Sequence, residues 1–145
     1  MSYVLDASVL VAATRPNEPY HIDAQVSLQR LMAERATLFA PTIALVELAA
    51  ALSRGGADAS LAEQVVEAYR QRRDLEFVSV DERLAGIAAT IAARQRIRGC
   101  DAIYVALAQQ QRAVLITLDN EQRQRAPATV AAWTPEELLA HWRSP

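Results

Sequence analysis

Short apolar runs alternate with longer segments of helical periodicity along the whole chain, and this alternation limits the possible folds more than any other feature. The apolar runs have the length of buried strands and lie at residues 3–5, 38–40, 77–80, 113–117 and 130–133. The helical segments cover residues 9–13, 20–35, 43–53, 61–73, 81–96 and 101–112, and a last one starts at 134. Strands that alternate with helices are typical of a parallel sheet covered on both faces. We therefore predict an α/β fold with a central parallel β-sheet flanked by helices, in three α/β/α layers.

Length and composition indicate one domain. The chain has 145 residues, of which 52% are hydrophobic and 22% are charged. This is enough apolar material for one core and too much for a disordered chain. No apolar run reaches the roughly 20 residues of a membrane span, and the N-terminus does not read as a secretory signal. We expect residues 1–145 to form a single domain that has no membrane contact and acts in the cytoplasm.

Several residue types are rare or missing, and this excludes whole classes of chemistry. Every basic residue is arginine, so no mechanism can use a catalytic lysine. One cysteine and two distant histidines cannot form a cysteine-rich or histidine-rich metal site. The four glycines do not form a phosphate-binding loop. Any chemistry must therefore come from carboxylates, hydroxyls and arginines.

Four acidic residues stand at positions that suit a shared site. Asp6 directly follows the first predicted strand, and Asp119 follows the strand at 113–117. Asp101 stands at the head of an apolar helix, and Glu47 is the only charge between residues 41 and 52. Because the carboxyl ends of parallel strands meet at one edge of the sheet, all four can converge there.

Each acid taken alone also has an ordinary structural explanation. Asp6 or Ser8 can cap the helix that follows the first strand, and Asp101 can cap its own helix. Asp119 can be a loop residue after a strand, and Glu47 can form a structural ion pair with an arginine. The functional interpretation depends on the four acids occurring together.

Converging carboxylates repel one another and take up protons unless a cation lies between them. Oxygen ligands favour Mg²⁺ or Mn²⁺, and the lack of histidine and cysteine clusters argues against zinc or copper. An acidic metal site suits phosphodiester hydrolysis, because the cation activates water and stabilises charge on the phosphate.

Four segments, taken in order, resemble the motifs of PIN-domain ribonucleases. The first is Tyr3–Ser8 and the second Pro41–Glu47; the third is Gly99–Ala106 and the fourth Leu115–Asp119. The resemblance covers essentially the whole chain, and its size and motif order are similar to those of the VapC toxins of bacterial toxin–antitoxin pairs. It implies a single PIN domain with Mg²⁺- or Mn²⁺-dependent endoribonuclease activity, a homodimer, and a cognate VapB-type antitoxin as partner.

The resemblance also assigns roles to individual residues. The catalytic and metal-binding acids that match the family's quartet are Asp6, Glu47, Asp101 and Asp119. Ser8 and Thr117 match hydroxyl positions that hydrogen-bond the carboxylates. We predict that Asp6 and Asp101 hold the cation directly, while Glu47 and Asp119 complete the site or bind through water. Glu47 is our candidate for taking the proton of the attacking water.

RNA binding has to be reconciled with a net charge of −2. The requirement is local rather than global, and arginine holds phosphates well. Two arginine groups flank the predicted acids in the sequence: Arg94, Arg96, Arg98, Arg123 and Arg125. They are our candidate RNA contacts; the alternative is that they are solvated surface charges.

Rival functions differ in the residues that they need. Response-regulator receiver domains and haloacid-dehalogenase-type phosphatases both require a lysine, which this chain lacks. Receiver domains also need an acidic pair near the first strand, where only Asp6 stands, and the phosphatases need a second aspartate where this chain has Ser8. A free-standing PIN nuclease and a non-catalytic PIN-like binding module remain as alternatives. Residues 9–13 and the apolar face of 61–69 exceed what a small sheet needs, so we expect them to contact a second copy or an antitoxin.

Overall fold

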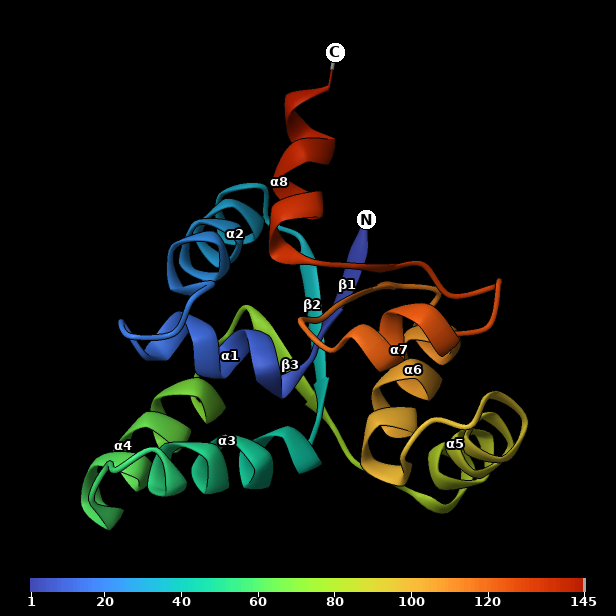
Figure 1. Ribbon diagram of the computed structural model, residues 1–145, viewed down its shortest axis with the longest axis horizontal. Coiled ribbons are helices and arrows are strands. Elements are labelled where there is room, and N and C mark those ends of the chain that lie inside the picture. The colour runs from blue at the N-terminus through green and yellow to red at the C-terminus, as the bar shows by residue number, and fades with distance from the viewer. Residues whose placement is uncertain (145) are drawn as a thin grey trace.

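Five parallel strands form the centre of the protein (Figure 1). In the computed structural model, which describes residues 1–144, they are β1 (Ser2–Leu5), β2 (Thr37–Pro41), β3 (Leu75–Val78), β4 (Val114–Ile116) and β5 (Ala132–Trp133). Their order in the sheet is β3-β2-β1-β4-β5, and every neighbouring pair is parallel. The predicted parallel sheet is confirmed, although β3 begins two residues earlier than expected and β5 two residues later.

Helices cover both faces of this sheet. They are α1 (Ala7–Thr14), α2 (His21–Ala33), α3 (Ile43–Arg54), α4 (Ala59–Arg70), α5 (Glu82–Gln95), α6 (Gly99–Gln111), α7 (Asn120–Arg125) and α8 (Pro135–Arg143). Helices α1 to α4 lie on one side of the sheet and α5 to α7 on the other, which confirms the three-layer α/β/α fold (Figure 1). No helix within residues 1–144 is long and apolar enough to cross a membrane.

The order of the strands reverses at β1. The chain builds β2 and β3 on one side of β1, and then returns to place β4 and β5 on the other side. In open parallel sheets, ligands bind at the carboxyl ends of the strands at such a reversal. The backbone N–H of Asp6 donates to the carbonyl of Ile116 at 3.0 Å, so the first residue after β1 lies directly beside the end of β4.

Helix α6 packs against the centre of the sheet. It contacts β1, β2 and β4. Six of its residues are buried: Ala102, Tyr104, Val105, Ala106, Leu107 and Ala108. This packing places the first turn of the helix at the edge where β1 and β4 end.

One expectation about helices is wrong, and one helix was missed. Residues 9–13 do not form a partner surface, because Val9 and Leu10 are at most 1% exposed and α1 packs between α2 and α3. Helix α7 was not predicted at all, since its sequence is entirely polar and shows no apolar spacing. Of the apolar face predicted at 61–69, Leu61 is 50% exposed, whereas Val65, Val66 and Tyr69 pack against the core.

Candidate active site

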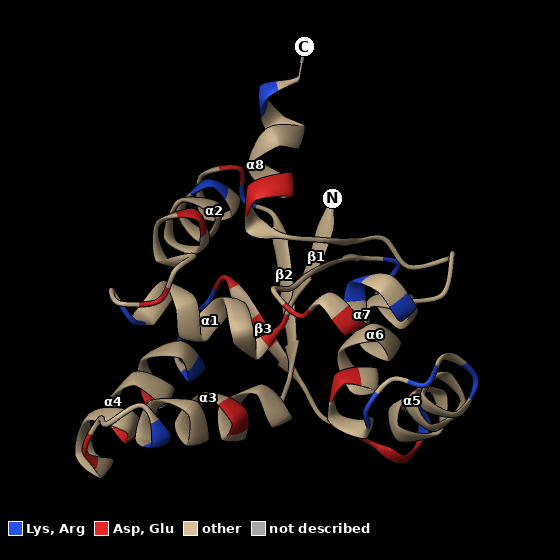
Figure 2. Ribbon diagram, viewed as in Figure 1, with Lys and Arg blue, Asp and Glu red and all other residues tan. Residues whose placement is uncertain are grey.

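A cavity of about 580 Å³ lies where β1 and β4 end. All four predicted acids line it: Asp6, Glu47, Asp101 and Asp119. They come from separate parts of the chain, namely the end of β1, the middle of α3, the first turn of α6 and the loop after β4. In Figure 2, acidic positions on α3 and α6 and at the starts of α1 and α7 accordingly face one another. The structure thus places all four acids around one cavity, as the strand order predicted.

Asp6 uses its two carboxylate oxygens for different neighbours. Oδ2 accepts the backbone N–H of Ser8 at 2.9 Å and so caps α1, while Oδ1 accepts Nε2 of Gln122 at 3.1 Å. The side chain is buried, and this burial raises the pKa of Asp6. Hydrogen bonds from Ser8 and Gln122 act in the opposite direction, and the charge of Glu47 raises the pKa further. The capping explanation is therefore correct without excluding a functional one.

Asp101 and Asp119 approach each other from the starts of α6 and α7. Helix α6 begins at Gly99, so Asp101 lies inside its first turn and does not cap it. Burial raises the pKa of Asp101, and the charges of Asp119 and Asp6 raise it further. Asp119 caps α7 through Oδ1, which accepts the N–H groups of Glu121 at 2.8 Å and Gln122 at 3.2 Å.

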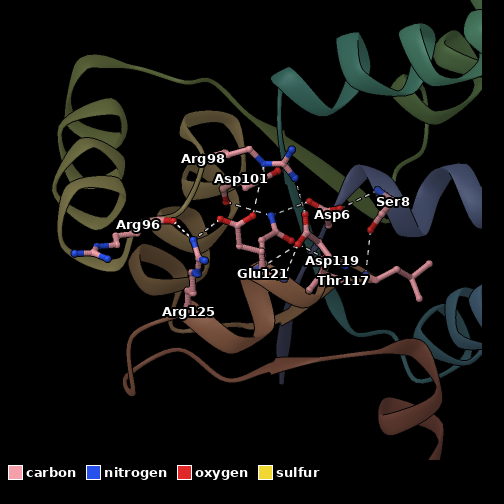
Figure 3. Close-up of polar contacts among 11 residues, drawn as sticks. Asp6, Ser8, Arg96, Arg98, Asp101, Thr117, Asp119, Glu121 and Arg125 are labelled. Carbon is pink, nitrogen blue, oxygen red and sulfur yellow. Dashed lines mark hydrogen bonds and ion pairs between the residues drawn. The ribbon is translucent and has the colours of Figure 1, made fainter.

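A cation from the chain itself already lies against these acids. Arg98 places Nε 3.2 Å from Oδ2 of Asp101 and Nη2 3.7 Å from Oδ2 of Asp119 (Figure 3). It also lies 3.8 Å from Glu121, and it lowers the pKa of Asp101. Its side chain is nevertheless 74% exposed, so solvent screens these pairs and the guanidinium can be displaced from them.

Glu47 has a tyrosine as its partner rather than an arginine. The hydroxyl of Tyr104 donates to Oε1 of Glu47 at 2.5 Å. Among residues 1–144 no arginine forms an ion pair with Glu47, so the structural ion pair considered from the sequence is wrong. Burial and the charges of Asp6 and Glu47 raise the pKa of Tyr104, which keeps it a donor. Its position three residues after Asp101, on the same helix, was the signal available in the sequence.

The two predicted hydroxyls differ in what they contact. Oγ of Ser8 accepts the backbone N–H of Leu118 at 3.1 Å, which leaves its proton for Asp6, whose pKa it lowers. Thr117 does not bond a carboxylate directly, contrary to the prediction. Its hydroxyl donates to Oε1 of Gln122 at 2.6 Å and accepts the N–H of Asp119 at 3.0 Å. Gln122 was not predicted, because a glutamine within a polar helix carries no distinctive signal.

Two of the predicted RNA-contacting arginines have structural partners. Arg123 pairs with Glu137 at 2.5 Å and so joins α7 to α8. Arg125 bonds Glu121 at 2.7 Å and the carbonyl of Arg96 at 2.6 Å. These contacts tie α7 to its neighbours and engage part of each guanidinium.

Of the other three, only Arg98 lies at the acids. The side chain of Arg96 points away from them in Figure 3, and Arg94 lines a separate hollow on α5. The acid-lined cavity is instead bordered by Arg54 at the end of α3 and by Tyr20 before α2, neither of which was predicted. Both are exposed.

The donor groups of the site fit a hard divalent cation. The acids present only oxygen donors, and burial together with mutual repulsion raises the pKa of Asp6 and Asp101, a cost that a bound cation relieves. Within residues 1–144 no three Asp, Glu, His or Cys side chains stand together as a ready set of ligands. Mg²⁺ commonly takes one or two carboxylates and keeps several waters, and the cavity has carboxylates and room for this.

Solved structures share this fold at low sequence identity. VapBC2 from Rickettsia felis, bound to a DNA fragment from its promoter, aligns with a TM-score of 0.72 at 18% identity, covering 92% of this chain and 98% of that one. FitAcB from Neisseria gonorrhoeae aligns with a TM-score of 0.71 at 21% identity, covering the same shares of the two chains. VapC20 from Mycobacterium tuberculosis is described as a sarcin–ricin-loop-cleaving toxin. It aligns with a TM-score of 0.73 at 18% identity, covering 90% of this chain and 99% of that one.

Sequence comparison gives the family. A search of curated proteins returned no match. The family model of the PIN domain matches residues 3–127, which span β1 to the end of α7 and include all four acids. The resemblance of the four motifs to PIN domains is confirmed, and the chain belongs to the PIN-domain family.

Proposed function

We propose that this protein is a metal-dependent endoribonuclease and the toxin of a toxin–antitoxin pair. The observation that carries the catalytic part is the convergence of four acids, from four separate elements, on one cavity at the strand-order reversal. Such an arrangement is costly without a ligand, because like charges repel and Asp6 is buried among them. The retention of all four acids argues against a non-catalytic PIN-like module.

Asp6 and Asp101 would hold Mg²⁺ or Mn²⁺ directly, with Glu47 and Asp119 completing the site or binding through water. A cation held there supplies an activated water and neutralises charge that develops on the phosphate. Asp6 and Asp119 each also bond a backbone N–H, at 2.9 Å and 2.8 Å, so their carboxylates are oriented before any ligand arrives.

Glu47 would accept the proton of the attacking water. Its Oε1 is engaged by Tyr104 at 2.5 Å, which orients the carboxylate and leaves Oε2 as the accepting atom. Arg98 and Arg54 would hold substrate phosphates, since both are exposed and border the cavity or its acids. Arg98 would have to leave Asp101 and Asp119 as the substrate and cation enter.

RNA as substrate and an antitoxin as partner are supported by the fold relatives. One relative is described as cleaving the sarcin–ricin loop, and others are VapBC or FitAB complexes. We propose a cognate VapB-type antitoxin, a homodimer, residues 1–145 as one PIN unit, and action in the cytoplasm, where the RNA is. A free-standing PIN nuclease would share the same chemistry and lack only the antitoxin.

RNA cleavage by the purified protein tests this function. We expect cleavage with Mn²⁺ or Mg²⁺, none in chelator, and a loss of about a hundredfold or more in the Asp101→Asn variant. Glu63→Gln, an exposed acid on α4, removes the same charge away from the cavity and serves as the control. Equal cleavage by Asp101→Asn and wild type, or full cleavage in chelator, would contradict the proposal.

A further inference from the structure

We propose that Gln122 is a positioning residue that sets the orientation of the Asp6 carboxylate for cation binding, and that Thr117 in turn fixes the orientation of the Gln122 amide. This inference rests on the proposed function, because it concerns how the same acids are held.

The amide of Gln122 is buried in an otherwise polar helix. Gln122 and Thr117 are both 0% exposed, and Gln122 is the one buried residue of α7. A primary amide taken out of water without hydrogen-bond partners is strongly destabilising, so a buried glutamine is retained only where its groups are satisfied. All of the polar contacts of this amide lie among the elements that carry the acids.

The direction of the amide follows from the hydroxyl beside it. Oγ1 of Thr117 accepts the N–H of Asp119 at 3.0 Å, so its own proton is directed to Oε1 of Gln122 at 2.6 Å. Nε2 then faces the other way, with Oδ1 of Asp6 at 3.1 Å and the carbonyl of Asp101 at 3.2 Å. If the amide were flipped, its Oε1 would face Oδ1 of Asp6 and the carbonyl oxygen of Asp101, which are both acceptors. Its NH₂ group would then face the hydroxyl proton of Thr117. Only one orientation is therefore compatible with these neighbours.

Gln122 links three of the four acidic residues. Its side-chain Nε2 donates to the Asp6 carboxylate and to the Asp101 carbonyl, and its backbone N–H donates to Oδ1 of Asp119 at 3.2 Å. With Ser8 N–H on one oxygen of Asp6 and Gln122 on the other, the plane of that carboxylate is fixed. Each oxygen keeps a lone pair for a cation. Partners that orient a metal-binding carboxylate in this way typically contribute about 10- to 100-fold to metal affinity.

The test compares Mn²⁺ affinity by calorimetry and the Mn²⁺ electron paramagnetic resonance spectrum with RNA kinetics. Gln122→Met has a similar length and no donor; we expect about tenfold weaker Mn²⁺ binding, an altered spectrum and a lower kcat, with the KM for RNA within about twofold of wild type. Gln124→Met, an exposed position on the same helix, is the matched control and should behave as wild type. A folded Gln122→Met protein that binds Mn²⁺ as tightly as wild type would overturn the proposal.

Thr117 provides a second arm if Gln122→Met does not fold. Thr117→Ser keeps the hydroxyl and should retain wild-type Mn²⁺ affinity, whereas Thr117→Val, which cannot orient the amide, should weaken it severalfold. Equal affinity in the two variants would overturn the proposal. Failure of the proposed function can be distinguished from failure of this inference. A wild-type chain that binds Mn²⁺ but leaves RNA intact would refute the nuclease activity, whereas the comparison of Mn²⁺ affinities would still decide the role of Gln122.

Discussion

At the scale of single residues, the carboxylates of this site have two roles at once. Asp6 and Asp119 each cap a helix with one set of contacts and border the cavity with the remaining oxygen atoms. Because caps contribute typically about 1 kcal/mol, part of the stability of the fold depends on acids that the site also needs. Asn can replace Asp as a cap, so Asp→Asn variants separate charge from capping.

Substituting Glu47 distinguishes a metal-site role from a purely structural one. Glu47→Gln keeps an oxygen that accepts the Tyr104 hydroxyl and removes a charge that raises the pKa of Asp6. We therefore expect an unchanged or higher melting temperature in chelator, measured by circular dichroism, and a loss of RNA cleavage of about a hundredfold or more, because an amide cannot take a proton from water. A variant that melts much earlier and still cleaves RNA normally would contradict this role.

The raised pKa of Asp101 has a consequence for stability. A carboxyl whose pKa is higher in the folded state contributes stability below its unfolded value, near 3.8, and this contribution is lost as pH rises through the folded pKa. In chelator, Asp101→Asn should therefore raise the melting temperature at pH 7, and the gain should shrink toward zero near pH 4. Melting curves across this range test the sign. A variant less stable than wild type at pH 7 and equal at pH 4 would show that the ion pair with Arg98 outweighs burial.

At the scale of elements, hydrophobic periodicity predicted the strands and the amphipathic helices. It did not predict α7, whose buried side chain is polar. The runs at 3–5 and 113–117 read as strands because nearly all of their residues are apolar. Helix α7 has no apolar face, because its buried contact is an amide bonded to the acids. That the four acids line one cavity could be predicted, because carboxylates after strands or within apolar helices are unusual. The role of Gln122 could not be predicted, since it depends on contacts between elements distant in the sequence. For Tyr104 the one available signal was its position three residues after Asp101 on the same helix.

Substitutions of Arg98 and Arg123 should have different effects on cation binding, RNA binding and stability. Arg98→Gln removes a cation that lies 3.2 Å from Asp101, so we expect tighter Mn²⁺ binding together with a higher KM for RNA. Arg123→Gln removes the link from α7 to α8 and should cost about 1 kcal/mol of stability, with the KM unchanged. Filter-binding and cleavage assays on both variants check this; a KM raised equally by the two would restore Arg123 as an RNA contact.

At the scale of the whole molecule, topology brings the site together. The reversal of strand order at β1 places the ends of β1 and β4 side by side, and the buried face of α6 holds Asp101 against them. The surface for a second copy or an antitoxin cannot include the buried face of α1. Exposed apolar side chains lie instead on α2, α3 and α4: Ile22, Val26, Met32, Val46 and Leu61. The extent of α1's burial depends on packing by α2 and α3, which periodicity alone does not reveal.

The central claim is that the four acids form a divalent-cation site. Calorimetric titration of Mn²⁺ into the wild type, Asp6→Asn and Asp101→Asn tests it most directly, with Glu63→Gln as the control for loss of one surface charge. We predict binding by the wild type and by Glu63→Gln, and at least about tenfold weaker binding by each of the other two variants, because a neutral amide is a poor ligand for a hard cation. Affinity equal to that of the wild type in both Asp6→Asn and Asp101→Asn would contradict the account.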